Sequence, residues 1–408
     1  MTATKTAGVG GQAFFMAGAS GCAQVLVALM YILAARDSEP EILGLAVSAI
    51  ALGTAAVGFI DFGTNSLWVR EIAAGRVAST AIGRRIAGKI GVTVALSAVW
   101  AAASALIAPE AKLWISAPIV LALLLSQTTQ VPLRAATRGR TVAILILLDR
   151  VVASVLFLAL EGLGVAGADA LWVALTAGSL TSAVLCWAVT PVAIRPRLRG
   201  QPWANPWRGA SSFGIAGLAT SAQAMDVTLL TTVAGPHAAG VYGAVGRWTQ
   251  PMMLLASAFS AAAAPFVASS GELAESWRRL RKALWMPALS VLGAVVVGLS
   301  APLLVDLLLG ERYKGSAVVL QILAAVAVLS ILSQPMAMAL QFLGHARIVA
   351  IAMSTAVALQ LVLIFILGRE LGAVGAAVSS LCAQVTVFII LITSARRQLR
   401  KARPDSSA

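Results

Sequence analysis

Long apolar runs dominate the chain, and short polar segments separate them. A membrane-spanning helix needs about 20 apolar residues, and almost every run here reaches that length. The pattern therefore predicts an all-α polytopic membrane protein with about twelve transmembrane helices. The predicted spans are 12–34, 43–66, 86–108, 113–133, 141–160, 170–190, 211–233, 241–267, 284–308, 316–343, 348–367 and 371–394.

Composition agrees with this pattern. The chain is 59% hydrophobic and only 11% charged, whereas about one quarter of a soluble domain is charged. A single water-soluble core is therefore excluded. The net charge of +14 raises the question of nucleic acid, but such binding needs a clustered basic surface with aromatic or groove-reading elements. The chain shows none, so we expect no nucleic-acid partner.

The basic residues instead report topology, because cytoplasmic segments of membrane proteins collect Lys and Arg. With the N-terminus inside, 23 of the 30 basic residues fall in inner segments and 5 in outer ones, while Arg150 and Arg247 lie within helices. The loop acids do the reverse. We therefore predict an even number of spans with both termini cytoplasmic, in a bacterial cytoplasmic membrane, and an attraction of the inner face to anionic membrane lipids.

A Pro- and Arg-rich stretch divides the predicted helices into six and six. It predicts an N-terminal lobe (1–195), a cytoplasmic linker (196–210), a C-terminal lobe (211–395) and a basic cytoplasmic tail (396–408). Transporters are often built from two such repeats. A weak internal repeat supports this division, because Gly44 begins the second predicted helix and Gly240, 196 residues later, begins the eighth.

No motif indicates catalysis, a cofactor or a metal. The three cysteines, Cys22, Cys186 and Cys382, lie in predicted helices without close spacing or a histidine partner, so we expect no metal site. The sequence holds neither a phosphate-binding loop nor a cluster of nucleophile, base and orienting residue. We therefore expect a protein that is not an enzyme and needs no cofactor.

Three segments resemble the bacterial O-antigen and exopolysaccharide flippases. Residues 43–76 carry a glycine start, Asp-Phe-Gly-Thr-Asn, and Arg-Glu-Ile-Ala near the cytoplasmic end. Residues 239–267 run Ala-Gly-Val-Tyr-Gly-Ala-Val-Gly-Arg-Trp-Thr-Gln-Pro to Ala-Pro-Phe-Val, and residues 305–347 carry Leu-Gly-Glu-Arg-Tyr-Lys-Gly-Ser and Leu-Gly-His-Ala-Arg. The superfamily also contains drug and organic-cation antiporters and the peptidoglycan-precursor flippases.

The resemblance implies two six-helix lobes around a central cavity that works by alternating access. The implied substrate is a polyprenyl-pyrophosphate-linked oligosaccharide, and the implied partners are a polysaccharide polymerase and glycosyltransferases of the same pathway. Arg247 aligns with a cavity arginine of the peptidoglycan-precursor flippases, where it is expected to meet the anionic headgroup. The first predicted helix departs from that branch, because it has no arginine between Gln12 and Ala35.

Ionisable groups at membrane depth usually face a cavity or a partner. Five side chains qualify, and they are Asp61, Asp149, Arg150, Asp226 and Arg247. Asp226 and Arg247 sit at similar depth on neighbouring antiparallel helices, so they predict an ion pair, which could be structural or could bind the headgroup or a proton. Asp149 and Arg150 are consecutive and point about 100° apart, so we predict that at least one finds a partner elsewhere or lines the cavity or the interface between the lobes.

Asp61 and Asn65 are spaced i, i+4, which places both on one face of a continuous helix. Arg70 and Glu71 follow at the cytoplasmic mouth. We predict that these four residues fix the helix end and the inner gate. Further basic side chains, Arg84, Arg85, Lys89 and Arg134, are expected to make the inner mouth cationic.

The five charges at depth leave a net charge of −1, which fits a pyrophosphate substrate poorly. A cation-coupled multidrug antiporter of the same superfamily therefore remains an alternative. Such a protein needs an acid that couples export to a proton or sodium ion, and Asp226 could supply it. The first predicted helix has no acid, which removes one common coupling position.

Overall fold

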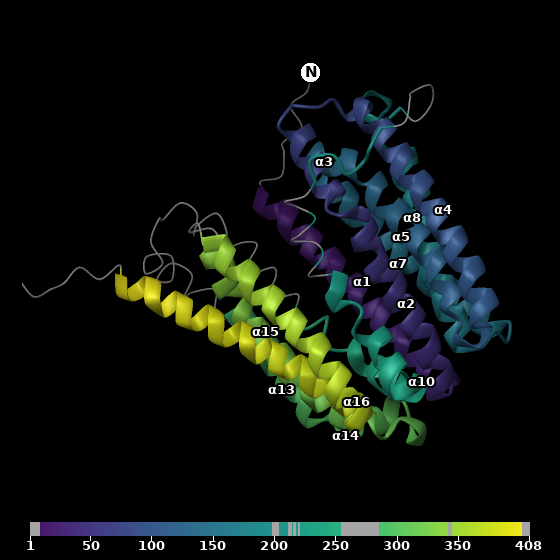
Figure 1. Cartoon of the computed structure of the whole chain (residues 1–408), viewed down its shortest axis with the longest axis vertical. Coiled ribbons are helices and arrows are strands. Elements are labelled where there is room, and N and C mark those ends of the chain that lie inside the picture. Colours follow the sequence, from purple (N-terminus) through teal and green to yellow (C-terminus); the bar gives the residue numbers. More distant parts are fainter. Residues whose placement is uncertain are drawn as a thin grey trace, which may run out of the picture. The chain divides into compact units, whose positions relative to one another are not determined.

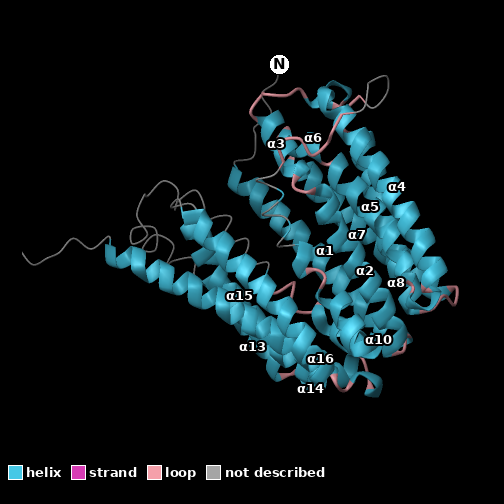
Figure 2. Cartoon of the chain, viewed as in Figure 1, coloured by secondary structure: helices cyan, strands magenta, loops and turns pink. Residues whose placement is uncertain are grey.

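The computed structural model describes residues 9–197, 204–210, 214, 218, 221–253, 285–341 and 345–401. These residues form helices and short connections, and none of the described residues is in a β-strand (Figure 2). The predicted all-α fold class is confirmed. The chain forms two compact units: Cys22–Ala244, and Val245–Ala408 together with the residues up to Gly21. The division into lobes at the 196–210 linker stays a prediction.

The unit Cys22–Ala244 is a bundle of long helices arranged around α5. In this bundle α5 packs against α2, α4 and α8, and α8 packs in turn against α7; Figure 1 shows α4, α5, α7 and α8 side by side. The helices of this unit are α1 (Val9–Asp37, which begins in the other unit), α2 (Pro40–Asp61), α3 (Thr64–Ala73), α4 (Gly83–Ile107), α5 (Ser116–Thr129), α6 (Val131–Ala135), α7 (Gly139–Gly162), α8 (Gly167–Val189) and most of α10 (Asp226–Gly246).

Small residues let these helices approach closely, as is usual in membrane bundles. A Cβ atom added at Gly53 of α2 would lie 2.9 Å from the side chain of Ile119 on α5. One added at Gly178 of α8 would lie 2.5 Å from the backbone oxygen of Asp149 on α7. The two glycines therefore set the spacing of α2–α5 and α7–α8.

The connection after α1 caps the start of α8. The carboxylate of Asp37 accepts a hydrogen bond from the Gly167 N–H (2.8 Å), and the hydroxyl of Ser38 accepts one from the Ala168 N–H (2.9 Å). These amides have no partner within their own helix. Trp172, which follows Gly167 in α8, stacks edge to face with Trp114, and the ring centroids are 5.7 Å apart. Tryptophan is enriched at membrane interfaces, and this end is the predicted outer one.

The other unit contains α13 (Trp285–Leu299), α14 (Ala301–Leu308), α15 (Ser316–Leu340) and α16 (Ala346–Lys401). Helices α13 and α14 meet at a bend of 68°. Helix α16 breaks at Gly372, whose φ of 56° favours glycine, and so contains the eleventh and twelfth predicted spans. Buried apolar side chains join α15 and α16: Leu340, Val349, Ala352, Ala356, Ala383, Val387 and Leu391.

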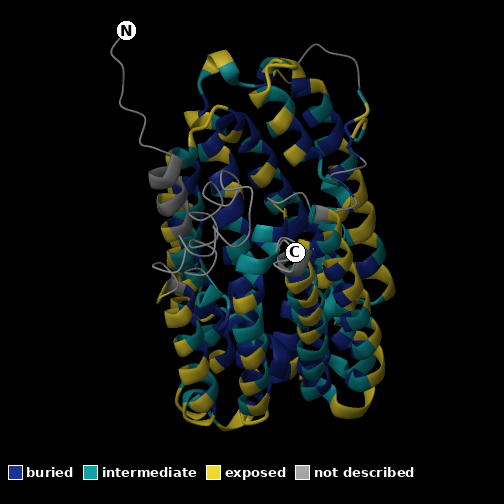
Figure 3. Cartoon of the chain, turned by 90° about the vertical axis from the view of Figure 1, so that its left-hand side faces the viewer, coloured by how far each residue is buried: buried dark blue, intermediate teal, exposed yellow. Residues whose placement is uncertain are grey.

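Eight described helices are long and apolar enough to cross a membrane, or nine if the bent α13–α14 pair is one span. Large apolar side chains point outward from them, including Val155 and Val184, which are 63% and 67% exposed. Figure 3 shows exposed positions in yellow recurring along the helices. Such apolar surfaces fit lipid, so the chain is a multi-pass membrane protein. Part of the seventh predicted span and most of the eighth lie outside the described residues.

Candidate functional site

The second predicted span does not continue as one helix. Helix α2 ends at Asp61 and α3 begins at Thr64. Between them, Phe62 and Gly63 both adopt the left-handed conformation, with φ of 43° and 70°. Glycine reaches this region without a steric penalty, and it is a common way to end a helix. The prediction that Asp61 and Asn65 share one face of a continuous helix is therefore wrong, because the chain turns between them.

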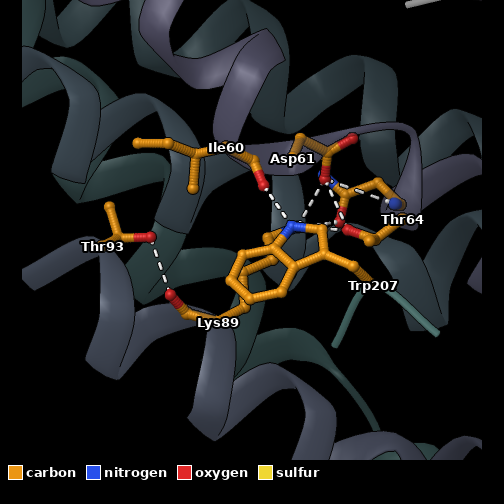
Figure 4. Close-up of polar contacts among 7 residues, drawn as sticks. Ile60, Asp61, Thr64, Lys89, Thr93 and Trp207 are labelled. Atoms are coloured by element: carbon orange, nitrogen blue, oxygen red, sulfur yellow. Dashed lines mark hydrogen bonds and ion pairs between the residues drawn. The ribbon is translucent and has the colours of Figure 1, made fainter. Parts of the chain in front are cut away.

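The turn instead gathers polar side chains around the buried Lys89 (Figure 4). We call Asp61, Thr64, Asn65 and Lys89 the Lys89 cluster. The ammonium of Lys89, on α4, donates to Asp61 Oδ1 (2.5 Å), Asn65 Oδ1 (2.9 Å) and Thr64 Oγ1 (3.0 Å). The Thr64 hydroxyl also donates to Asp61 Oδ1 (2.9 Å). Lys89 is completely buried. An ammonium has three protons, so the cluster uses its full capacity.

Aromatic side chains close the cluster. The Lys89 Nζ atom lies 4.8 Å from the ring centroid of Trp68, within cation–π range. Trp68 is itself fully buried, and it packs with apolar residues of α4 such as Ile86. On the α2 side, the Trp207 indole donates to the backbone oxygen of Ile60 (2.8 Å; Figure 4). This bond satisfies a carbonyl that the end of α2 leaves without a helical partner.

Lys89 corrects the predicted charge distribution. The sequence predicts Lys89 at the cationic inner mouth, but the residue is buried against Asp61. A single lysine inside an apolar span, with an acid ending the preceding span, was the signal that could have revealed the pair. With Lys89 added to the five groups named from the sequence, three are acids (Asp61, Asp149 and Asp226) and three are bases (Lys89, Arg150 and Arg247).

The other two predicted inner-gate residues lie at the end of α3. Glu71 Oε2 is 3.6 Å from Arg85 NH1 on α4, and the two side chains are 25% and 28% exposed. Arg70 precedes Glu71 in the last turn of α3. Helix α4 thus provides partners for Asp61, Asn65 and Glu71.

The chain leading into the predicted linker lies against the start of α4. The Ser79 hydroxyl donates to the Ile194 backbone oxygen (2.5 Å), and the Arg197 N–H donates to the Thr80 oxygen (3.3 Å). A Cβ atom at Gly83 would lie 1.9 Å from the Arg197 oxygen. Only glycine fits there, so this contact is part of the fold.

Asp149 is a second buried acid, and its contacts are incomplete. It lies on α7, is 7% exposed, and packs against α8 beside Gly178. Its Oδ2 atom is 3.7 Å from Arg150 NH2, so the two consecutive side chains do approach, although at more than hydrogen-bond distance. Ser179 on α8 lies close enough to interact with the Asp149 carboxylate, but among the described residues neither Asp149 Oδ1 nor the Ser179 hydroxyl makes a hydrogen bond of regular geometry. Cavity lining by Asp149 or Arg150 stays a prediction.

Asp226 begins α10 and bonds within its own unit. The Tyr242 hydroxyl donates to Asp226 Oδ2 (3.1 Å), and the Val227 N–H donates to Oδ1 (2.7 Å). Arg247 follows α10 and donates from NH1 to Gln250 Oε1 (3.3 Å). The predicted ion pair between Asp226 and Arg247 stays a prediction.

Gly44 and Gly240, the two glycines of the internal repeat, lie in close contact between α2 and α10. A Cβ atom at Gly44 of α2 would lie 1.8 Å from the oxygen of Pro236, and one at Gly240 of α10 would lie 1.8 Å from the oxygen of Pro40. The contact is reciprocal, because each proline precedes its glycine by four residues. The 196-residue offset therefore has a structural counterpart, which we call the glycine contact: Pro40, Gly44, Pro236 and Gly240.

Polar groups flank the glycine contact. The residues that follow the two prolines, Glu41 and His237, pair at 2.7 Å between Oε1 and Nδ1, and both side chains are more than half exposed. Further along, the Thr228 hydroxyl donates to the Ser48 oxygen of α2 (3.0 Å). A break at Gly235 (φ 85°) redirects the chain just before Pro236. Short-range packing and one exposed pair therefore hold α10 on α2.

No protein-family model matches the sequence, and no curated sequence does. Solved structures do resemble the chain. The lipid II flippase MurJ in an inward closed conformation has a TM-score of 0.72 at 11% identity, over 93% of this chain and 87% of that one.

Two transporters also resemble it. An inward-facing multidrug resistance MATE family transporter of the MOP superfamily has a TM-score of 0.60 at 15% identity, over 97% and 96% of the two chains. A eukaryotic MATE transporter has a TM-score of 0.59 at 14% identity, over 96% and 97%. At such low identity the likeness concerns the fold. The chain therefore has the fold shared by MATE transporters of the MOP superfamily and the lipid II flippase.

Proposed function

We propose that this protein is a flippase. It moves a polyprenyl-pyrophosphate-linked oligosaccharide from the inner to the outer leaflet of a bacterial cytoplasmic membrane, for cell-surface polysaccharide synthesis. The observation that carries the proposal is the fold comparison: the TM-score is 0.72 to a lipid II flippase and 0.60 to a multidrug transporter, at similar coverage of this chain. A lipid-linked sugar is the class of substrate that the flippase name implies.

Charge supports the proposal. Once Lys89 is counted, the three acids named at membrane depth are matched by three bases, so the net charge of −1 of the five original groups no longer opposes a pyrophosphate substrate. The predicted inner loops remain strongly basic, and they would attract an anionic headgroup on that side. In this proposal Arg247 contacts the pyrophosphate, and Asp226, Asp149 and Arg150 line the path with it. Polymerase and glycosyltransferases of the same pathway are the proposed partners.

The two ends of α2 support alternating access, because they are held in different ways. One end carries the buried Lys89 cluster, and breaking a buried ion pair costs about 3–5 kcal/mol. The other end carries the glycine contact and the exposed Glu41–His237 pair, and an exposed pair contributes about 0–1 kcal/mol. We therefore assign the glycine contact to an outer gate that opens, and the Lys89 cluster to a fixed support beside the inner gate.

A cation-coupled antiporter is the second candidate, and one observation favours it. Asp149 is buried, its Oδ1 atom makes no hydrogen bond of regular geometry among the described residues, and Arg150 is 3.7 Å away. A carboxyl group with an open acceptor at membrane depth is suited to take up a proton or a small cation. In that function, Asp149 would couple export to an ion gradient.

Transport by purified protein in liposomes tests the two candidates. Flipping of a fluorescent polyprenyl-pyrophosphate sugar is compared with uptake of a cationic dye under a proton or sodium gradient. The wild type is compared with Arg247→Ala and with Gly44→Leu. Gly91→Leu is the matched control, because a Cβ at Gly91 on α4 meets nothing within 4 Å.

The flippase proposal expects lipid flipping by the wild type and by Gly91→Leu, with a loss of at least tenfold in Arg247→Ala and in Gly44→Leu. Normal flipping in Gly44→Leu would remove the gate assignment and leave the flippase. Gradient-driven dye uptake without lipid flipping would replace the flippase with the antiporter. In that case, Asp149→Asn would abolish uptake.

A further inference from the structure

An apolar groove runs along the unit Cys22–Ala244 between α4, α5, α6 and α8. Its volume is about 290 Å³. Its floor contains the buried residues Ile86 and Pro132, and its edge carries Val184, which is 67% exposed. Ile90, Trp187 and Pro196 also line it. Because its edge is apolar and exposed, the groove opens toward lipid and not into water.

A fixed arginine stands at one end of the groove. Arg195 donates from Nε and NH2 to the Thr190 oxygen, at 3.2 and 2.9 Å, and from NH2 to the Ala188 oxygen at 3.1 Å. Its guanidinium carbon also lies 5.7 Å from the ring centroid of Trp187, a lining residue. These bonds hold the guanidinium at the last carbonyls of α8, where a cation is favoured. They use Nε and NH2, which leaves NH1 to meet a ligand.

A second arginine fits a charged lipid at this end. Arg197 is exposed and lies just beyond Pro196, which lines the groove. The groove therefore offers two cations at one end of an apolar channel.

We propose that this groove is a binding site for one anionic phospholipid of the membrane leaflet on the linker side. Arg195 and Arg197 contact its phosphate, and an acyl chain lies between Ile90 and Val184. Basic pockets between membrane helices bind anionic headgroups in this manner. The site needs only the membrane location of the chain, so it holds for either transport function.

Native mass spectrometry of the full chain tests the site, with phosphatidylglycerol titrated against phosphatidylcholine. The wild type should retain one phosphatidylglycerol with preference over phosphatidylcholine. Arg197→Gln and Arg195→Gln should each weaken binding about fivefold, since one basic residue near a membrane surface contributes about 1 kcal/mol. Arg195→Lys should recover most of the loss. Val184→Trp should block the groove. The exposed edge has room for the larger indole, which would occupy the space between Ile90 and position 184 that the acyl chain needs.

Arg347→Gln is the matched control, because Arg347 is an exposed arginine of α16 in the other unit. A second measurement uses Trp187: phosphatidylglycerol with brominated chains should quench wild-type fluorescence more than that of Trp187→Phe. Equal phosphatidylglycerol binding by Arg195→Gln, Arg197→Gln, Val184→Trp and the control would overturn the proposal. So would retention of phosphatidylcholine as strongly as phosphatidylglycerol, because the cations would then have no role.

Discussion

The unit Cys22–Ala244 contains two aspartates with little exposed surface, and their neighbours differ. The side chain of Asp61 is 14% exposed, and its Oδ1 atom accepts hydrogen bonds from a buried cation and a hydroxyl. The side chain of Asp149 is 9% exposed, and its cation, Arg150, lies 3.7 Å away, beyond hydrogen-bond distance. The residue type is the same, so the difference lies in the neighbours. An acid held by a buried cation stabilises a fold, whereas one without such a bond is available to a ligand or a proton.

The largest effect is expected from Lys89→Met. The substitution leaves the largely covered Asp61 carboxylate without its buried cation, which should lower stability by about 3–5 kcal/mol. Thermal unfolding of the detergent-solubilised protein measures the loss. A second variant that combines Lys89→Met with Asp61→Leu should regain most of it, because an apolar pair often replaces a buried ion pair without penalty. A double variant as unstable as the single one would show that the pair is not the source of the stability.

Asn65→Leu should have a smaller effect. It removes one of the three acceptors of Lys89 and leaves one ammonium proton unsatisfied, at a cost of about 1–3 kcal/mol. Ser66→Ala is the control, because Ser66 is the exposed neighbour in the same helix. The same unfolding assay applies to both. If the two variants were equally stable, water or another group would have to replace the Asn65 oxygen.

Asp149→Asn should change stability little, or raise it by up to about 1 kcal/mol, because a neutral amide is less costly to bury than an incompletely paired carboxylate. Asp61→Asn should do the opposite and destabilise the protein. The informative measurement is the pair of unfolding temperatures side by side. A loss in Asp149→Asn as large as that in Asp61→Asn would mean that Asp149 is also a structural acid.

The smallest effect is expected at the edge of the Lys89 cluster. Glu71→Gln removes a partly exposed pair with Arg85 and should cost at most about 1 kcal/mol. The difference from wild type should shrink in about 1 M salt, where the screening length is about 3 Å. A loss that persists in high salt would place Glu71 among the buried network instead.

Some of the site followed from sequence, and some did not. The polarity of Asp61 and Asn65 inside an apolar run marked them correctly as unusual. Their arrangement was wrong, because the helix period assumes a continuous helix and the left-handed residues at 62 and 63 interrupt it. Lys89 was missed for a different reason. A lysine a few residues after Arg84 and Arg85 looks like one more loop charge until its partner is known.

The glycine contact shows a second limit of prediction from sequence. The repeat of Gly44 at Gly240 was visible in the sequence, but apolar glycine-rich helices match one another easily. Only the structure shows that each glycine faces the carbonyl of the other segment's proline. The separation of two residues in the sequence does not determine the distance between them in the fold. A repeat alone therefore does not show whether its two copies are in contact.

The sequence by itself determined that this is an all-helical, multi-pass membrane protein. Helix length and apolar runs are local properties, and a bilayer leaves a chain few other ways to satisfy its backbone. The tertiary structure decided which charges are paired, which acid is left open, and where α2 is held. Those outcomes depend on contacts between residues 24 to 196 positions apart, and such pairing arises only when the helices pack.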